Sequence, residues 1–167
     1  MAYASVLKQA DIFFDLAAAE LERVAALCQE RRYGLGDLIF EENSASHELY
    51  LIAQGEVDIQ VDPALVADAN ARPSRPITLT TLRRGQVFGE IALVDQGLRS
   101  ATARSVAKDT LVLVIPRDKL MALCESDPNL GFRIMRNLAS DVALKLRTTG
   151  YLIREEVLYG APRRERK

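Results

Sequence analysis

Several residue types are scarce in this chain of 167 residues, and each scarcity argues against a class of protein. There is one histidine, His47, and there are two cysteines, too few for a cluster of imidazole and thiolate ligands around a metal ion. Cys28 and Cys124 form no C-x-x-C pattern and fall in segments with helical spacing, so we expect two reduced, buried thiols. No Ser–His–acid or Cys–His pairing can be built with conviction around one histidine in an expected loop, so we expect no enzyme, no metal and no cofactor.

Long apolar runs and an excess of one charge are missing as well. The apolar run Leu111–Ile115 is far shorter than the roughly 20 residues that cross a membrane, and no signal-peptide pattern opens the chain. A net charge of −1 provides no basic face for nucleic acid. Hydrophobic residues at 49% and charged residues at 27% are ordinary for a globular domain, which we expect in the cytoplasm without a membrane partner.

Helical spacing is found near both ends of the chain. Asp15 is suited to an N-cap, and apolar residues at positions 21, 24, 25 and 28 predict a helix over 16–29. A short helix is predicted over 117–125. Asp127 and Pro128 then provide the capping residue and the first-turn proline that begin a longer helix, which reaches about residue 159.

Between these helices, the segment 31–116 has the alternation and the glycine turns of short strands. Strands are predicted at 38–40, 49–52, 56–61, 77–82, 101–107 and 110–115, the last of them buried on both faces. Gln54-Gly55 predicts a two-residue hairpin turn. These elements predict an α+β fold, a small antiparallel β-roll resembling a jelly-roll barrel, flanked by an N-terminal helix and a long C-terminal helix.

The long helix has an apolar stripe that extends beyond what the roll needs for its own cover. Its members, at three-to-four spacing, are Ile134, Leu138, Val142, Leu146, Thr149, Ile153 and Val157. The helix is roughly 45 Å long at the standard rise per residue. Either the last turns fold back on the roll of the same subunit, or the stripe packs against the same helix of a second copy. We favour a homodimer.

Two segments have little periodicity. Residues 62–76 join two strands expected to form a hairpin, and this long loop is either a tolerated insertion or a flap that contacts a partner or responds to a ligand. The charged residues 161–167 are expected to be a disordered tail. The remainder, residues 1–160, is long enough for one domain with its own core.

The run 88–102 has the chemistry of an anion site. Gly89 opens a segment of about one helical turn, whose unpaired N–H groups and positive dipole end suit an anion. Arg99 follows beyond a turn and can bring a guanidinium over the same anion, with the Ser100 hydroxyl beside it. Because the Glu90 carboxylate repels phosphate, we expect it to accept from neutral donors such as sugar hydroxyls. Together these groups describe a small sugar phosphate. Glu90 and Arg99 taken alone would favour a surface salt bridge.

Two runs, Phe88-Gly-Glu-Ile-Ala-Leu and Arg99-Ser-Ala-Thr, together resemble the phosphate-binding cassette of cyclic-nucleotide-binding domains. Three further runs resemble that family's strands in the same order: Asp37-Leu-Ile-Phe-Glu-Glu, Leu49-Tyr-Leu-Ile-Ala-Gln-Gly-Glu-Val and Leu111-Val-Leu-Val-Ile-Pro-Arg. The resemblance covers roughly residues 10–150. It implies a β-roll domain over residues 1–160 that binds a cyclic nucleotide. We favour cAMP over cGMP because Arg99-Ser-Ala matches the activator branch of the family.

The resemblance also implies a role for each cassette residue. Glu90 accepts from the ribose 2′-hydroxyl, and Arg99 and Ser100 hold the cyclic phosphate together with backbone N–H groups. The complete set of implied ligand-binding residues in the cassette is Phe88, Gly89, Glu90, Ile91, Ala92, Arg99, Ser100 and Ala101.

For the purine base, relatives use a hydroxyl on the long helix, sometimes one from the partner subunit. Thr149 is the best match and Thr148 the next, while Tyr151 stacking on the base is the alternative. Pro128 and Thr149 are 21 residues apart (149 − 128 = 21), about one turn more than the family pattern, so this part of the sequence departs from the family.

The implied function is a stand-alone cyclic-nucleotide sensor that acts on an unknown downstream protein through rearrangement of its C-terminal helices. The alternatives are the sensory half of an activator-type transcription regulator or other multi-domain protein, and a degenerate fold used for protein contacts. Eight residues follow Tyr159 (167 − 159 = 8), too few for the helices of a helix-turn-helix, so we expect no DNA binding by this chain alone.

Overall fold

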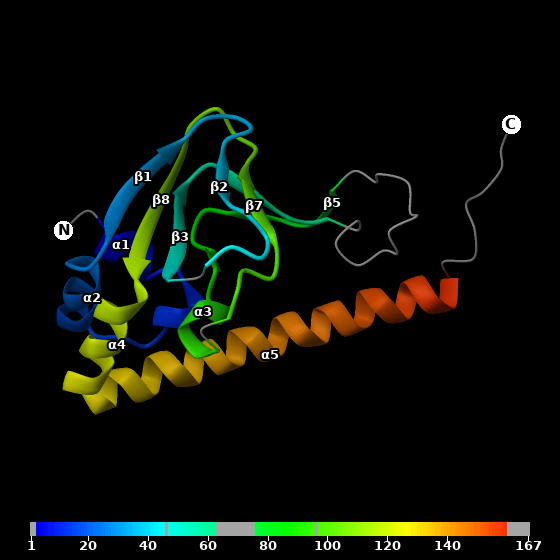
Figure 1. Ribbon diagram of the computed structural model, residues 1–167. Coiled ribbons are helices and arrows are strands. Elements are labelled where there is room, and N and C mark those ends of the chain that lie inside the picture. The colour runs from blue at the N-terminus through cyan, green and yellow to red at the C-terminus, as the bar shows by residue number, and fades with distance from the viewer. Residues whose placement is uncertain (1–2, 46, 63–75, 96, 160–167) are drawn as a thin grey trace, which may run out of the picture.

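Two four-stranded antiparallel sheets form a β-roll, and helices from both ends of the chain pack against one of them in the computed structural model (Figure 1). The structure describes residues 3–45, 47–62, 76–95 and 97–159. The helices are α1 (Ala4–Leu7), the 3-10 helix η1 (Asp11–Phe13), α2 (Ala18–Ala25), α3 (Ile91–Val94), α4 (Arg117–Ser126) and α5 (Pro128–Tyr159). The strands are β1 (Gln29–Tyr33), β2 (Leu38–Phe40), β3 (Glu48–Gln54), β4 (Glu56–Val61), β5 (Ile77–Arg83), β6 (Val87–Phe88), β7 (Thr102–Ser105) and β8 (Thr110–Pro116). The predicted fold class is confirmed.

The strand order is β1-β8-β3-β6 in one sheet and β2-β7-β4-β5 in the other. The predicted hairpin of the strands 56–61 and 77–82 is confirmed, because β4 pairs with β5 and Val57 lies opposite Leu82. The residues that join these two strands, 63–75, lie outside the described part of the chain, so the question of an insertion or a flap at 62–76 stays open.

The hairpin predicted at Gln54-Gly55 is wrong, because β3 and β4 belong to different sheets. Gly55 instead turns the chain from one sheet into the other, with φ +85°. A Cβ at this position would lie 2.4 Å from Thr110 Oγ1, so the corner passes close against the start of β8. β3 lies between β8 and β6, a central place that suits a strand with apolar residues on both faces.

β8 separates the two parts of the hydrophobic core. Leu113 and Ile115 pack on the helical side, in the cluster that includes Ile134 of α5. Val112 and Val114 point the other way, into the interior of the roll. This alternation confirms the prediction of a strand buried on both faces, and it makes β8 the wall shared by both layers.

The N-terminal helix is shorter than predicted. α2 begins after Ala17, whose N–H donates to the Glu20 carboxylate at 2.7 Å, while Asp15 adopts φ +62° and is not the N-cap. The predicted end at residue 29 is also wrong, because Gln29 already pairs with β8. Cys28 therefore lies between helix and strand, where burial raises the pKa of its thiol to about 12.

α5 packs on the roll only along its first half. Ile134 and Leu138 of the predicted stripe are buried, while the described side chains from Leu146 to Tyr151 are exposed, so this stretch does not fold back on its own roll. The helix continues through Gly150 without a break, and Figure 1 shows it extending well past the sheets. The side chains of the last two stripe members, at positions 153 and 157, lie outside the described residues.

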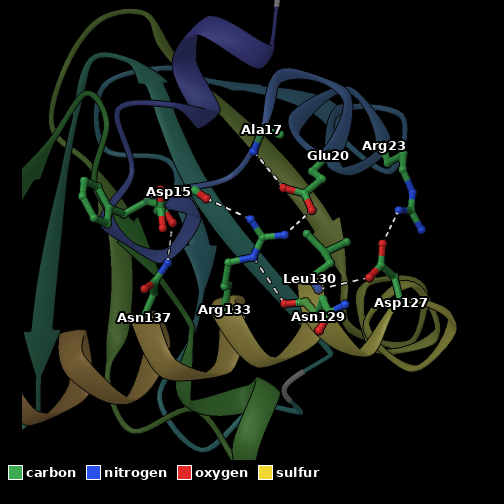
Figure 2. A network of polar contacts seen from close by, with 10 residues as sticks. Asp15, Ala17, Glu20, Arg23, Asp127, Asn129, Leu130, Arg133 and Asn137 are labelled. Atoms are coloured by element: carbon green, nitrogen blue, oxygen red, sulfur yellow. Dashed lines mark hydrogen bonds and ion pairs between the residues drawn. The ribbon is translucent and has the colours of Figure 1, made fainter.

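Polar contacts tie the N-terminal segment to the start of α5 (Figure 2). The Arg133 guanidinium donates to the Asp15 carbonyl at 3.1 Å and forms an ion pair with Glu20. The buried Asn137 amide donates to the Phe14 carbonyl at 2.7 Å and to the Ile12 carbonyl at 3.3 Å. The first turns of α5 and the N-terminal helices are therefore held together as one layer.

The junction of α4 and α5 is bound to the same layer. Asp127 accepts from the Leu130 N–H at 3.1 Å, which confirms it as the predicted cap of α5. Its other oxygen pairs with Arg23 of α2 at 2.6 Å, and this hydrogen bond lowers the pKa of the Asp127 carboxyl. A movement of this junction would have to carry α2 with it or break that ion pair.

Replacing Asn137 tests this connection. We expect Asn137→Ala to lower the free energy of unfolding by about 1–3 kcal/mol, because two buried carbonyls lose their donor. Ser140→Ala is the matched control on the exposed face of α5 and should change stability by no more than about 0.5 kcal/mol. Urea unfolding followed by circular dichroism measures both, and equal midpoints would show that the Asn137 contacts contribute nothing.

Candidate ligand-binding site

The predicted anion site lies where β6 meets α3. Gly89 joins the two elements with φ +73°, a left-handed conformation, and the predicted helical turn is present as α3. The chain then returns beside residues 43–45. The Asn43 N–H donates to the Arg99 carbonyl at 2.8 Å, and the Arg99 N–H donates to the Ser44 carbonyl at 2.9 Å. The backbone of Arg99 is thus fixed on both sides.

The Arg99 side chain points inward and is only 4% exposed. Its guanidinium donates to the Glu48 carbonyl at 2.9 Å and to the Gly89 carbonyl at 3.3 Å, and its Cζ lies 4.2 Å from the centre of the Phe40 ring. Within the described residues, the buried Nε has no hydrogen-bond partner. Burial lowers the pKa of Arg99, but a guanidinium stays protonated, so the result is a desolvated cation with donor capacity left for an anion.

A second set of contacts holds the ring beside Arg99. The Tyr50 hydroxyl donates to Glu48 Oε2 at 2.6 Å, and Glu48 is paired with Arg31 at 2.5 Å. The Tyr50 ring stacks on Phe88 at 5.0 Å between centroids, and its own pKa is raised by burial and by the bond to Glu48. The hydrogen bond from Tyr50 and the pair with Arg31 lower the pKa of Glu48 in spite of its burial. Phe88 therefore packs on the rings of Tyr50 and Phe40, which in turn lie against the guanidinium.

Glu90 occupies the N-cap position of α3, makes no side-chain capping hydrogen bond there, and is only 7% exposed. Its Oε1 lies 3.1 Å from Nζ of Lys145, a residue of α5. Lys145 also pairs with Asp141 at 2.9 Å. Lys145 was not among the residues predicted from the sequence; the four-residue spacing from Asp141 to Lys145 was the one local sign of a helical ion pair there.

The other predicted residues occupy different environments. Ser100 is exposed beside Arg99, Ile91 is partly exposed on α3, and Ala101 is buried. Ala92 lies within α3, but its side chain is outside the described residues.

Thr149 lies on the exposed stretch of α5, where its hydroxyl donates to the Lys145 carbonyl at 2.9 Å. The Thr148 hydroxyl donates in the same way to the Leu144 carbonyl of its own helix. Tyr151, also on α5, is exposed. The structure of one chain therefore does not bring these base-contact candidates to the cassette, and the role of Thr149 stays a prediction.

The described residues contain neither a metal-binding cluster nor a membrane-spanning helix. No group of three or more His, Cys, Asp or Glu side chains within that part of the chain is arranged to hold a metal ion. Among the helices described, none is long and apolar enough to span a membrane. The charged groups of the cassette itself are a buried guanidinium and a buried carboxylate.

Comparison with known families agrees with this geometry. A family model of the cyclic nucleotide-binding domain matches residues 30–127, which is more than half of the chain and includes the whole cassette. The chain belongs to the cyclic nucleotide-binding domain family. The resemblance inferred from the cassette and strand motifs is thereby confirmed.

Individual relatives of this cyclic nucleotide-binding domain are regulators and longer proteins. It is 32% identical over 141 residues to the Cyclic AMP receptor protein of Thermus thermophilus, covering 84% of this chain and 59% of the relative. It is 26% identical over 116 residues to human cGMP-dependent protein kinase 2, covering 70% of this chain and 14% of the kinase. The solved Thermus thermophilus Catabolite Activator Protein superposes with a TM-score of 0.71 at 30% identity, covering 86% of this chain and 62% of that one. The chain thus spans less than two thirds of each of these relatives.

A pair of glycine substitutions tests how tightly the cassette is built around Arg99. A Cβ at position 89 would lie 2.5 Å from Arg99 Nη1, whereas a Cβ at Gly36, which has φ +85°, would meet nothing within 4 Å. We expect Gly36→Ala to lower the free energy of unfolding by about 1 kcal/mol through backbone strain alone. Gly89→Ala should lower it by about 1–3 kcal/mol more, because the guanidinium must shift. Urea unfolding measures both, and equal losses would mean that Arg99 moves freely.

Proposed function

We propose that this domain is a cyclic-nucleotide sensor that binds cAMP in preference to cGMP at the cassette. The observation that carries the proposal is the buried Arg99 guanidinium, which is held in place by two carbonyls and has an unpaired Nε. A desolvated, preorganised cation binds an anion more strongly than a surface arginine does, because it loses little side-chain entropy or hydration on binding.

In this proposal, different cassette residues contact different parts of the ligand. Arg99 and the Ser100 hydroxyl bind the cyclic phosphate, together with the backbone N–H groups of Gly89, Ile91 and Ala92. The buried Glu90 carboxylate accepts a hydrogen bond from the ribose 2′-hydroxyl. Phe88 and Ala101 line the floor. The preference for cAMP is supported by the Arg99-Ser-Ala run and by the relative named as a Cyclic AMP receptor protein.

The response to the ligand passes to the C-terminal helices. Phosphate capture at Arg99 draws α3 inward, and the junction at Asp127 and the following helix adjust. The exposed stretch of α5 then binds a second copy of the chain, and Thr149 of that copy or of the same copy meets the base. On this proposal the domain is regulatory and carries out no reaction of its own.

A second candidate is the sensory part of a longer regulator. The observation that favours it is length, because the chain matches only 59% of the Cyclic AMP receptor protein and 14% of the kinase. Both candidates use the same pocket and differ only in what α5 is connected to.

Calorimetric titration with cAMP and cGMP tests the pocket. We expect cAMP to bind more tightly, and Arg99→Ala to weaken binding at least about thirtyfold, because removing a desolvated charge partner costs roughly 2–5 kcal/mol. Arg104→Ala is the matched control, since Arg104 also donates to a backbone carbonyl, that of Gly36, but stands outside the cassette. Unchanged affinity in Arg99→Ala would refute the pocket, and stronger binding of cGMP would refute the base preference.

The proposed homodimer is tested through Leu146, which is 72% exposed on α5. We expect the wild-type chain to sediment as a dimer in analytical ultracentrifugation, and Leu146→Glu to weaken that dimer at least about tenfold by burying a charge at the helix contact. Leu79→Glu is the control, because Leu79 is a similarly exposed leucine, at 55%, on β5 of the roll. A monomeric wild-type chain, or equal effects of both variants, would contradict association through α5.

A further inference from the structure

Among the described side chains of α5, Lys145 is the last one with a polar contact to the roll, and every described side chain beyond it is exposed. Its Nζ lies 3.1 Å from Glu90 Oε1 and 2.9 Å from Asp141 Oδ2, and it donates to the Val87 carbonyl at 3.4 Å. Val87 belongs to β6 and Glu90 directly precedes α3, so one ammonium group joins α5 to both of these elements.

The electrostatics of this cluster require a cation. The Glu90 and Asp141 side chains are only 9% and 13% exposed, and two carboxylates so close in a desolvated place would repel each other without a shared positive charge. Burial alone would lower the pKa of Lys145, but the charges of Glu90 and Asp141 outweigh it and the net shift is upward. Lys145 therefore stays charged and holds the Glu90 side chain in place.

The ion pair with Lys145 leaves the Glu90 carboxylate able to accept further hydrogen bonds. An ionised carboxylate has about four acceptor positions, and the bond from Lys145 occupies one of them. The ammonium also offsets the repulsion between the Glu90 charge and an anion bound at Arg99. Lys145 thus supports a hydroxyl donor at Glu90 instead of competing with it.

We propose that Lys145 is a positioning residue for sugar recognition, which orients Glu90 toward a ribose hydroxyl and couples that contact to α5. The inference rests on the proposed function and deepens it, because it assigns the link between the sugar part of the site and the helix. It follows from reciprocity that a ligand bound at Glu90 must stabilise the docked position of α5 by as much as docking strengthens the ligand contact.

The location of Lys145 determines which part of α5 the coupling reaches. Leu138 is buried and Val142 half-buried against the roll, whereas Leu146 is exposed. Losing the contact at Lys145 leaves the helix beyond Val142 with no polar anchor to the cassette among the described residues. Amide hydrogen exchange over residues 141–149 should therefore slow when ligand binds, and should slow less in a variant that lacks the ammonium.

The test compares cAMP with 2′-deoxy-cAMP, which lacks the hydroxyl that Glu90 would accept. We expect Lys145→Met to weaken cAMP binding about tenfold and to change 2′-deoxy-cAMP binding less than about threefold, because only the sugar contact is lost. Lys145→Arg keeps the charge and should recover most of the affinity. Arg147→Met is the matched control, since it removes an exposed cation two residues further along α5 and should leave both affinities unchanged.

The outcomes separate the inference from the proposed function. Suppose that the wild-type protein binds cAMP. If Lys145→Met then binds both nucleotides as tightly as the wild type, or binds both more weakly by the same factor, the role of Lys145 is overturned and the pocket is not. Wild-type protein that binds neither nucleotide overturns both. Thermal unfolding by circular dichroism confirms that each variant is folded, and Lys145→Gln, which keeps a polar head of similar length, replaces Lys145→Met if that variant unfolds.

Discussion

The buried guanidinium of Arg99 is the interaction on which the rest of the cassette depends. Taking a cation out of water is unfavourable unless fixed partners receive it, and here two carbonyls and the face of Phe40 do so. The left-handed Gly89 lets the backbone come close to the guanidinium, where a side chain would collide with it. The Glu48–Tyr50 contact keeps the neighbouring ring in position. Together these contacts hold one buried charge in a fixed position.

The long helix has two halves with different surroundings, and the cassette lies at the boundary between them. Its first half belongs to the core and is joined to the N-terminal layer through Arg133 and Asn137. Its second half has exposed apolar side chains such as Leu146. Lys145 lies between the halves and contacts Glu90. The Lys145–Glu90 contact thus joins the cassette to the part of α5 whose described side chains are exposed.

Sequence reasoning was most successful where the signal is local. Alternating apolar residues identified β4, a continuous apolar run identified β8, and Asp127-Pro128 identified the start of α5. It was wrong at Gly55, because a turn residue does not reveal whether the strands on either side pair with each other or with distant strands. It was wrong at Asp15, which adopts a left-handed backbone and whose carbonyl accepts from Arg133, 118 residues away along the chain.

The sequence by itself determined the order and kind of most elements and the chemistry of the cassette, because periodicity and capping act over a few neighbouring residues. Only the tertiary structure decided which groups meet. Arg99 reaches the Glu48 carbonyl 51 residues away, and Lys145 of α5 reaches Glu90 because the helix crosses the roll at that point. Such contacts depend on strand register and on how the helix packs against the sheet, and neither is written in the spacing of nearby residues.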